Sequence, residues 1–260
     1  MADVTVDTVP SHENDGGGEK RLKRYRIAAV GDLHCRVDRP DRLRRAFTYV
    51  HEEADLMLLA GDLTDHGTEE EATLLAEELA TVRIPKIAVL GNHDWESGKA
   101  AEVTKILCKA GIRVLDGDVY VHEGQLGIAG IKGFAGGFGN ATLEPWGEEI
   151  LKKFVYEAVN ESLRLEMALA RIKTIERRIA LMHYAPVRGT IEGENPEIAP
   201  FLGCSRLADP LNKYSALAIV HGHAHKGTLK GATNRGVPVY NCAMPVLKDT
   251  LDKRYFVFEV

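Results

Sequence analysis

The sequence predicts an α/β protein with a parallel sheet that is covered by helices. Apolar runs of strand length alternate with segments whose apolar residues recur at helical spacing. In the first half we predict strands over 27–30, 56–60 and 87–90, and helices over 41–53, 68–80 and 99–110. A repeated strand-then-helix order is typical of a parallel sheet with helices outside it.

Local signals support these elements. The helix over 41–53 has apolar residues at helical spacing, and the strand over 56–60 is apolar throughout, as expected when both faces are buried. Thr68 and Glu71 predict a capping box at the start of the second helix. Gly111 is placed to end the third helix.

The second half has shorter strands and one long helical segment. We predict strands over 119–122, 126–131, 179–182, 217–220 and 255–259, a glycine-rich loop over 133–139, and helical structure over 148–175. Glu161 and Ser162 interrupt the apolar stripe of that segment, so the pattern does not require one unbroken helix. The polar, glycine-rich start predicts a flexible N-terminal tail over 1–24, followed by one domain over 25–260.

Composition narrows the function classes. The chain has 260 residues and 45% hydrophobic residues, which suits one large domain with a full core. A net charge of -5 disfavours nucleic acid as a partner. Its four cysteines show no CxxC spacing, which predicts free thiols in a reduced, cytoplasmic protein. No apolar run approaches the roughly 20 residues of a membrane span, and the N-terminus lacks signal-peptide features.

Short polar motifs directly follow the predicted strands. In open α/β sheets, ligands bind at the carboxyl ends of the strands, so we expect these motifs to converge on one edge. Glycines before the polar residues permit sharp turns and close backbone approach. The motifs are Gly31-Asp32-Leu33-His34, Gly61-Asp62, Gly91-Asn92-His93-Asp94, His183 and Gly222-His223-Ala224-His225.

The side chains in these motifs predict a site for two metal ions. Two ions a few ångströms apart can hold a phosphoryl group and generate a hydroxide. Mixed imidazole and carboxylate ligands suit Mn, Fe, Zn or Ni better than Ca, and we expect two divalent or trivalent ions, Mn first among them. His93 is the candidate general acid. The candidate ligands are Asp32, His34, Asp62, Asn92, His183, His223 and His225.

Over roughly 26–242 the chain resembles the calcineurin-like metallophosphoesterases, because all five motifs of that family are present. The resemblance implies a four-layer α/β/β/α sandwich of two mixed sheets flanked by helices. It implies that Asp62 bridges two metals, that Asn92 and His93 contact the substrate phosphate, and that Asp94 orients His93. The first metal would be held by Asp32, His34, Asp62 and His225, and the second by Asp62, Asn92, His183 and His223.

The resemblance implies hydrolysis of a phosphate ester by a metal-bridging hydroxide, with His93 protonating the leaving oxygen. We expect a small, nucleotide-like phosphodiester or phosphomonoester. The alternatives are a nuclease or a protein phosphatase of the same superfamily, or a non-catalytic scaffold that binds a protein partner. Asp65 stands where purple acid phosphatases have a metal-bound tyrosine, so no iron–tyrosinate centre is expected.

Specificity and assembly are left open by the motifs. An apolar segment, Gly189 to Gly203, lies between two ligand motifs and is interpreted as a lid or an oligomer contact, so a homodimer is one option. A cluster of arginines follows the first motif, and one or two of them could meet the substrate phosphate. They are Arg36, Arg39, Arg42, Arg44 and Arg45.

Overall fold

The computed structural model describes residues 7–8 and 23–260 and contains two six-stranded sheets. The first has the order β1-β12-β2-β3-β4-β5. Its strands β2 to β5 are parallel, and β12 runs antiparallel to β2. The bounds are β1 Asp7–Thr8, β2 Arg26–Val30, β3 Leu56–Ala60, β4 Lys86–Val89, β5 Ile112–Val114 and β12 Phe256–Glu259.

The second sheet is also mixed, with the order β10-β11-β9-β8-β7-β6. Its central strands are parallel, and an antiparallel strand lies at each edge. The bounds are β6 Asp118–His122, β7 Leu126–Gly130, β8 Arg177–Leu181, β9 Ala218–His221, β10 Lys230–Ala232 and β11 Pro238–Asn241.

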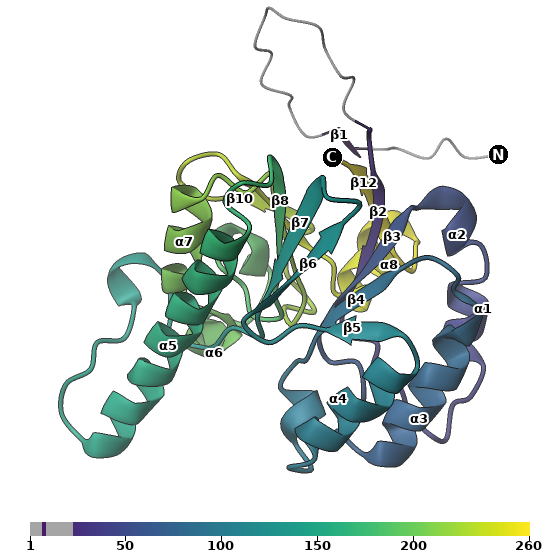
Figure 1. The fold of residues 1–260 in the computed structure, drawn as a ribbon. Coiled ribbons are helices and arrows are strands. Elements are labelled where there is room, and N and C mark those ends of the chain that lie inside the picture. Colours follow the sequence, from purple (N-terminus) through teal and green to yellow (C-terminus); the bar gives the residue numbers. More distant parts are fainter. Residues whose placement is uncertain (1–6, 9–22) are drawn as a thin grey trace, which may run out of the picture.

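Helices cover the outer faces of both sheets and complete a four-layer sandwich (Figure 1). Helices α1 to α4 lie on the side of the first sheet, and α5 and α7 lie on the side of the second. The predicted α/β/β/α sandwich of two mixed sheets is therefore confirmed. The bounds are α1 Arg42–Ala46, α2 Val50–Glu53, α3 Glu69–Glu78, α4 Ala100–Lys109, α5 Glu149–Arg171, α6 Ala199–Leu202, α7 Ala208–Lys213 and α8 Met244–Leu251.

The largest apolar cluster joins the two sheets. Leu58 on β3, Leu181 on β8 and Val220 on β9 are all fully buried within it. The continuous apolar strands recognised in the sequence are thus the strands that are buried on both faces. This packing places the carboxyl ends of the parallel strands of both sheets on the same side, the lower side of the sheets in Figure 1.

One helix prediction needed revision, and the structure decides a second point that the sequence left open. The helix predicted over 41–53 is two short helices separated by a turn at 47–49, a stretch of weaker helix formers in which the Thr48 hydroxyl bonds back to the Arg44 carbonyl (3.0 Å). The segment predicted over 148–175 is one unbroken helix, α5, which ends at Arg171. Glu161 is buried within its apolar stripe because its carboxylate accepts hydrogen bonds from the Gly133 amide (2.7 Å) and the Arg164 guanidinium (2.8 Å).

Other predictions were confirmed or lie beyond the described residues. The capping box of Thr68 and Glu71 is present at the start of α3. Within the tail predicted over 1–24, β1 pairs with β12, and residues 1–6 and 9–22 lie outside the described residues. All four cysteines are free. In the part of the chain that the structure describes, no helix has the length and apolar character needed to span a membrane.

Candidate metal centre

The loops after β2, β3, β4, β8 and β9 bring all of the predicted metal ligands together. Asp62 belongs to two groups of side chains whose candidate ligand atoms lie within 4.8 Å of one another. The first group is Asp32, His34, Asp62 and His225, and the second is Asp62, His183 and His223. Asn92 adjoins the second group, because its Oδ1 lies 2.9 Å from Nε2 of His183.

Two glycines of the motifs are required by close contact with acidic side chains. A Cβ at Gly91 would lie 2.1 Å from Oδ1 of Asp62, and a Cβ at Gly222 would lie 2.4 Å from Oδ2 of Asp32. Any side chain at either position would displace the neighbouring carboxylate. The close approach that the motifs predict is therefore present at both positions.

Four predicted ligands have a left-handed backbone conformation, which non-glycine residues rarely adopt. Such residues are held at a cost of about 1–3 kcal/mol each and concentrate at functional sites, where the surrounding structure enforces them. Their φ angles are 56° at Asp32, 41° at His34, 47° at Asp62 and 70° at His223. Four of the eight non-glycine residues with positive φ among the described residues are thus candidate ligands.

His34 supplies a direct test of whether the site fits a metal ion. Its Nε2 is buried, lies 3.9 Å from Oδ2 of Asp62, and has no hydrogen-bond partner among the described residues. A buried polar atom without a partner is unfavourable, and a metal ion would satisfy it. Burial also lowers the pKa of His34, which favours the neutral, ligating form of the ring.

Two other candidate histidines, His183 and His223, are oriented by backbone carbonyls. Nδ1 of His183 lies 2.9 Å from the Ala60 carbonyl, and Nε2 of His223 lies 3.2 Å from the Phe201 carbonyl. Each ring therefore uses one nitrogen to hold a backbone oxygen and keeps the other for the cluster. This arrangement is characteristic of metal-binding histidines, whose outer nitrogen fixes the tautomer and the ring orientation.

Asp32 is held in its charged form despite full burial. Burial by itself would raise its pKa, but the hydrogen bond from His225 (2.9 Å) and the nearby charges of His183 and His223 lower the pKa to about 2. The backbone amide of His223 also donates to this carboxylate (2.9 Å). Asp32 is thus an ionised oxygen donor at neutral pH, as metal ligation requires.

The sequence profile described as "Calcineurin-like phosphoesterase" matches residues 25–227, which is most of the chain. The protein belongs to this family. Membership agrees with the order of the motifs, with the two mixed sheets and with the two donor groups that share Asp62.

The chain is similar in sequence to one curated protein and in fold to solved structures. The chain is 27% identical over 174 residues to the "Probable glycerophosphodiester phosphodiesterase GpdQ" of Arcobacter nitrofigilis; the match covers 66% of this chain and 57% of that protein. Its fold matches the phosphopantetheinyl hydrolase PptH of Mycobacterium tuberculosis (TM-score 0.59, 16% identity, 90% of this chain and 95% of that one). It also matches purple acid phosphatase PPD1 of yellow lupin (TM-score 0.55, 16% identity), and this match covers 87% of this chain and 44% of that one.

The structure assigns Asp94 a different neighbourhood from the one expected. Its buried carboxylate accepts hydrogen bonds from the amides of Leu63 (3.1 Å), Thr64 (2.8 Å) and Gly91 (2.8 Å). It therefore joins the loop after β3 to the loop after β4. The expected contact of Asp94 with the His93 ring is corrected, because that ring is oriented by another residue.

Asp65 is the residue that orients His93, a role that its sequence motif does not reveal. Its carbonyl lies 2.7 Å from Nδ1 of His93, and its Oδ1 lies 3.0 Å from Nδ1 of His34. Arg36 in turn holds the second carboxylate oxygen (3.3 Å). The only sequence signal was an acidic residue three positions after Asp62, which we had interpreted solely as the absence of a tyrosine.

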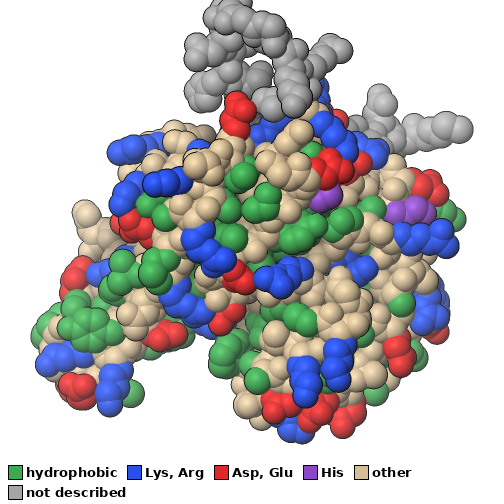
Figure 2. Space-filling view, in the orientation of Figure 1, with side chains coloured by type: hydrophobic (Ala, Val, Ile, Leu, Met, Phe, Trp, Pro, Cys, Tyr) green, Lys and Arg blue, Asp and Glu red, His purple; other side chains and the backbone are tan. Residues whose placement is uncertain are grey.

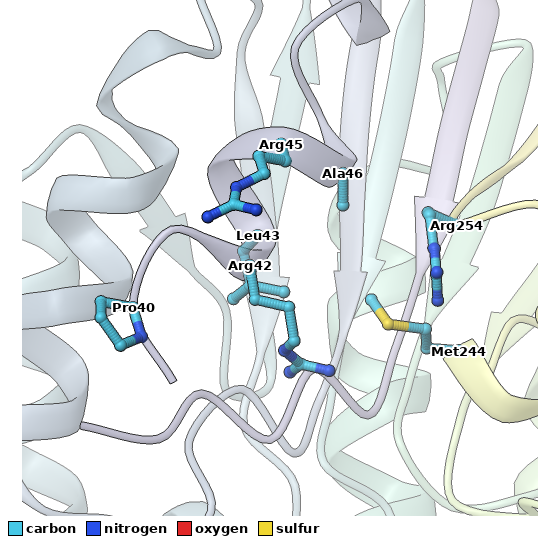
Figure 3. Close-up of a pocket in the computed structure, with 7 residues that line it drawn as sticks. All are labelled: Pro40, Arg42, Leu43, Arg45, Ala46, Met244 and Arg254. Atoms are coloured by element: carbon cyan, nitrogen blue, oxygen red, sulfur yellow. The ribbon is translucent and has the colours of Figure 1, made fainter. Parts of the chain in front are cut away.

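Arg42, one residue of the arginine cluster, contacts the loop that follows β2. Figure 3 shows Arg42, Arg45 and Arg254 around a hollow of about 530 Å³ next to Met244, the first residue of α8. Arg42 donates hydrogen bonds to the carbonyls of Leu33 and His34. This guanidinium therefore braces the loop that carries two candidate ligands, and contact of the cluster with substrate phosphate stays a prediction.

We expect Asp65→Asn to weaken metal binding while leaving the fold intact. Losing the carboxylate that holds a metal-binding histidine typically lowers metal affinity by about 10–100-fold. Titration of metal-stripped protein with Mn²⁺, followed by calorimetry, measures this change. The matched control is Asp38→Asn, because Asp38 also accepts a hydrogen bond from Arg36 (2.9 Å) but does not hold the His34 ring. Equal affinities in the two variants would contradict a positioning role for Asp65.

Proposed function

We propose that residues 25–260 form a catalytic domain that hydrolyses a small phosphate ester with two bound metal ions. The observation that carries this proposal is the sharing of Asp62 by two donor groups at the carboxyl ends of the strands. One carboxylate between two sets of imidazole and oxygen donors suits a bridging ligand. The unpartnered Nε2 of His34 supports the same assignment independently.

In this proposal the two donor groups divide the ligands as the family resemblance implies. Asp32, His34, Asp62 and His225 hold the first ion, and Asp62, Asn92, His183 and His223 hold the second. When bound, the ions supply positive charge for the phosphoryl oxygens and lower the pKa of a water molecule. The mixed donors favour Mn, with Fe, Zn and Ni as alternatives.

His93 is proposed to protonate the leaving oxygen. Its Nδ1 donates to the Asp65 carbonyl, which leaves Nε2 for the substrate, and its backbone amide donates to Asp62 (2.9 Å). Burial alone would lower the pKa of His93, but the Asp65 carbonyl and the carboxylates of Asp62 and Glu96 raise it above its ordinary value. The raised pKa favours the protonated imidazole that a general acid requires.

A phosphodiester is the favoured substrate class. The relative from Arcobacter nitrofigilis is named as a phosphodiesterase, and it shares more of its sequence with this chain than the structural neighbours described above do. The negative overall charge argues against a nuclease, since long nucleic acids bind to basic surfaces. The free thiols are compatible with the proposed cytoplasmic setting.

The test of the function compares para-nitrophenyl phosphate with bis-para-nitrophenyl phosphate. Metal-stripped protein should be inactive, and resupply with Mn²⁺ should restore hydrolysis, faster for the diester. The ratio of the two rates separates a diesterase from a monoesterase. Binding of two metal ions without turnover of either ester would favour the scaffold alternative.

The effect of His93→Ala on the rate of hydrolysis should depend on the leaving group, if His93 is the general acid. Removing a general acid lowers the rate by about 10²–10⁴-fold when the leaving oxygen needs a proton. Nitrophenolate leaves without protonation, so we expect a much smaller loss with para-nitrophenyl esters than with alkyl esters. Measured kcat for a diester series with leaving groups of increasing pKa provides this comparison. A uniform loss across the series would show that His93 positions phosphate and does not donate a proton.

A further inference from the structure

The apolar segment between the last two ligand motifs lies against the proposed metal centre. It contains the 3₁₀ turns η4 Arg188–Ile191 and η5 Pro196–Ile198, followed by α6. The Phe201 carbonyl on α6 is 3.2 Å from Nε2 of His223. The Pro200 and Leu202 carbonyls accept hydrogen bonds from Gly136 (2.8 Å) and Ala185 (3.0 Å). Backbone hydrogen bonds therefore hold the segment beside the candidate site, and its role as a lid or an oligomer contact stays a prediction.

A chain of aromatic rings leads from His223 back to α6. The Tyr184 ring lies 4.5 Å from the His223 ring, and Phe134 lies 6.0 Å from Tyr184. Phe154 on α5 lies 5.0 Å from Phe134 and 6.5 Å from Phe201. We call Phe134, Phe154, Tyr184 and Phe201 the aromatic shelf. The shelf meets the metal centre at both of its ends, through the Tyr184 ring and through the Phe201 carbonyl.

The outer part of this shelf is exposed to a degree that packing does not explain. The Phe201 side chain is 60% exposed, and Ile198 on the same segment is 40% exposed. Ile150, one helical turn before Phe154 on α5, is 76% exposed. Figure 2 shows further hydrophobic side chains gathered over α5 and the loop before it. Exposed apolar side chains that gather beside a candidate site favour a binding surface there.

The charged groups beneath the shelf are already used within the protein. The Lys132 ammonium donates to the Gly133 carbonyl (2.8 Å) and lies 5.0 Å from the Phe134 ring centroid. Glu161 accepts from the Gly133 amide and from Arg164 (2.8 Å). Both charged groups are therefore held by contacts within the protein, and the group that lies directly beside His223 is the ring of Tyr184, a surface that suits an apolar substituent.

We propose that the substrate is a phosphodiester in which one ester group is an apolar alkyl or aryl group. The aromatic shelf binds this apolar group. The inference deepens the proposed function and rests on it, because the metal centre must hold the phosphate. The hydrogen bond between His223 and the Phe201 carbonyl sets the shelf beside that phosphate. The apolar ester group then lies over Phe201 and Phe154, where it covers surface that is otherwise in water.

The test is a chain-length series of para-nitrophenyl alkyl phosphates, from methyl to hexyl, with the Mn²⁺-loaded protein. Full burial of one methylene is worth about 0.8 kcal/mol, or about fourfold, and an open shelf should give about half that free energy, or about twofold. We therefore expect kcat/KM to rise by about 30-fold from methyl to hexyl. Phe201→Ala should reduce this ratio to about fivefold or less, and Phe201→Leu should retain most of it.

The matched control is Tyr156→Ala, an exposed aromatic residue on α5 that is not part of the shelf. It should leave both the activity and the hexyl-to-methyl ratio unchanged. Unfolding temperatures of all variants exclude a general loss of fold. A second readout is calorimetry with methyl- and hexylphosphonate, which carry no cleavable ester, and the affinity should rise along the series in the same way.

The outcomes separate the inference from the proposed function. If no ester is hydrolysed in the presence of Mn²⁺, the proposed function fails. If all esters are hydrolysed with a flat chain-length dependence, or if Phe201→Ala keeps the full ratio, the function stands and the shelf assignment is overturned. A flat dependence together with a dimer that Phe201→Ala dissociates would identify the shelf as an interface between two copies of the chain.

Discussion

Asp62→Asn should lose metal at both donor groups and abolish metal-dependent hydrolysis. Asp62 is the single side chain common to the two groups, so its neutralisation removes a charged ligand from each ion. Mutation of a residue that only hydrogen-bonds to a metal ligand lowers metal affinity by about 10–100-fold. Loss of the ligand Asp62 itself should lower it further. Elemental analysis after dialysis gives the metal content, and bis-para-nitrophenyl phosphate gives the activity.

The fold should survive this substitution. Asparagine has the same shape as aspartate, and its amide oxygen can still accept the hydrogen bond from the His93 backbone (2.9 Å). The control is Asp249→Asn, an exposed carboxylate on α8, which should keep two ions and full activity. An Asp62→Asn protein that retains both ions would refute the bridging assignment. Loss of metal with retained binding to a protein partner would favour the scaffold alternative.

Gly91→Ala should disrupt the centre as severely as Asp62→Asn does, although glycine has no side chain that could bind a metal. The new Cβ would lie 2.1 Å from Oδ1 of Asp62 and 2.2 Å from its backbone nitrogen. The second of these atoms belongs to the main chain, so a change of rotamer cannot relieve the overlap. Inserting atoms into a packed site costs about 1–3 kcal/mol, and we expect at least that loss in the free energy of unfolding.

The measurement pairs thermal unfolding with metal content. For a domain of this size, 1 kcal/mol corresponds to about 2–4 °C, so a fall of several degrees is expected together with loss of activity. The matched control is Gly189→Ala, since a Cβ at Gly189 would meet nothing within 4 Å. If Gly91→Ala bound two ions and unfolded at the wild-type temperature, the close approach in this structure would be incorrect.

Much of the fold and of the site was predictable because the relevant signals are local. A continuous apolar run such as 56–60 specifies a strand buried on both faces, and the Thr68–Glu71 capping box specifies a helix start. The ligand motifs follow such strands directly, so parallel topology alone places them at one edge. Several elements were not predicted. The elements β5, β10, β11 and α6 have three or four residues each, too few for a periodic pattern, and α7 and α8, with six and eight residues, were missed as well.

Residues that position the candidate ligands, without being ligands themselves, could not be recognised from local sequence signals. Asp65 was visible only as an acidic residue near Asp62, because its contacts with His34 and His93 join loops about thirty residues apart. Asp94 lies next to His93 in the sequence, yet its carboxylate is directed to amides of the neighbouring loop. Adjacency in the chain is a poor guide to side-chain direction, since the backbone turns sharply at these positions.

The amino-acid sequence alone therefore specified the chemistry of the centre and the sheet edge where it forms. Donor type and position after a strand are properties of short segments, and they do not depend on how the rest of the chain packs. Only the tertiary structure decided which nitrogen of each histidine faces the cluster, which carbonyl holds His93, and that Phe201 stands beside His223. Those relations depend on distances between loops that are remote in the chain, which packing of the two sheets brings together.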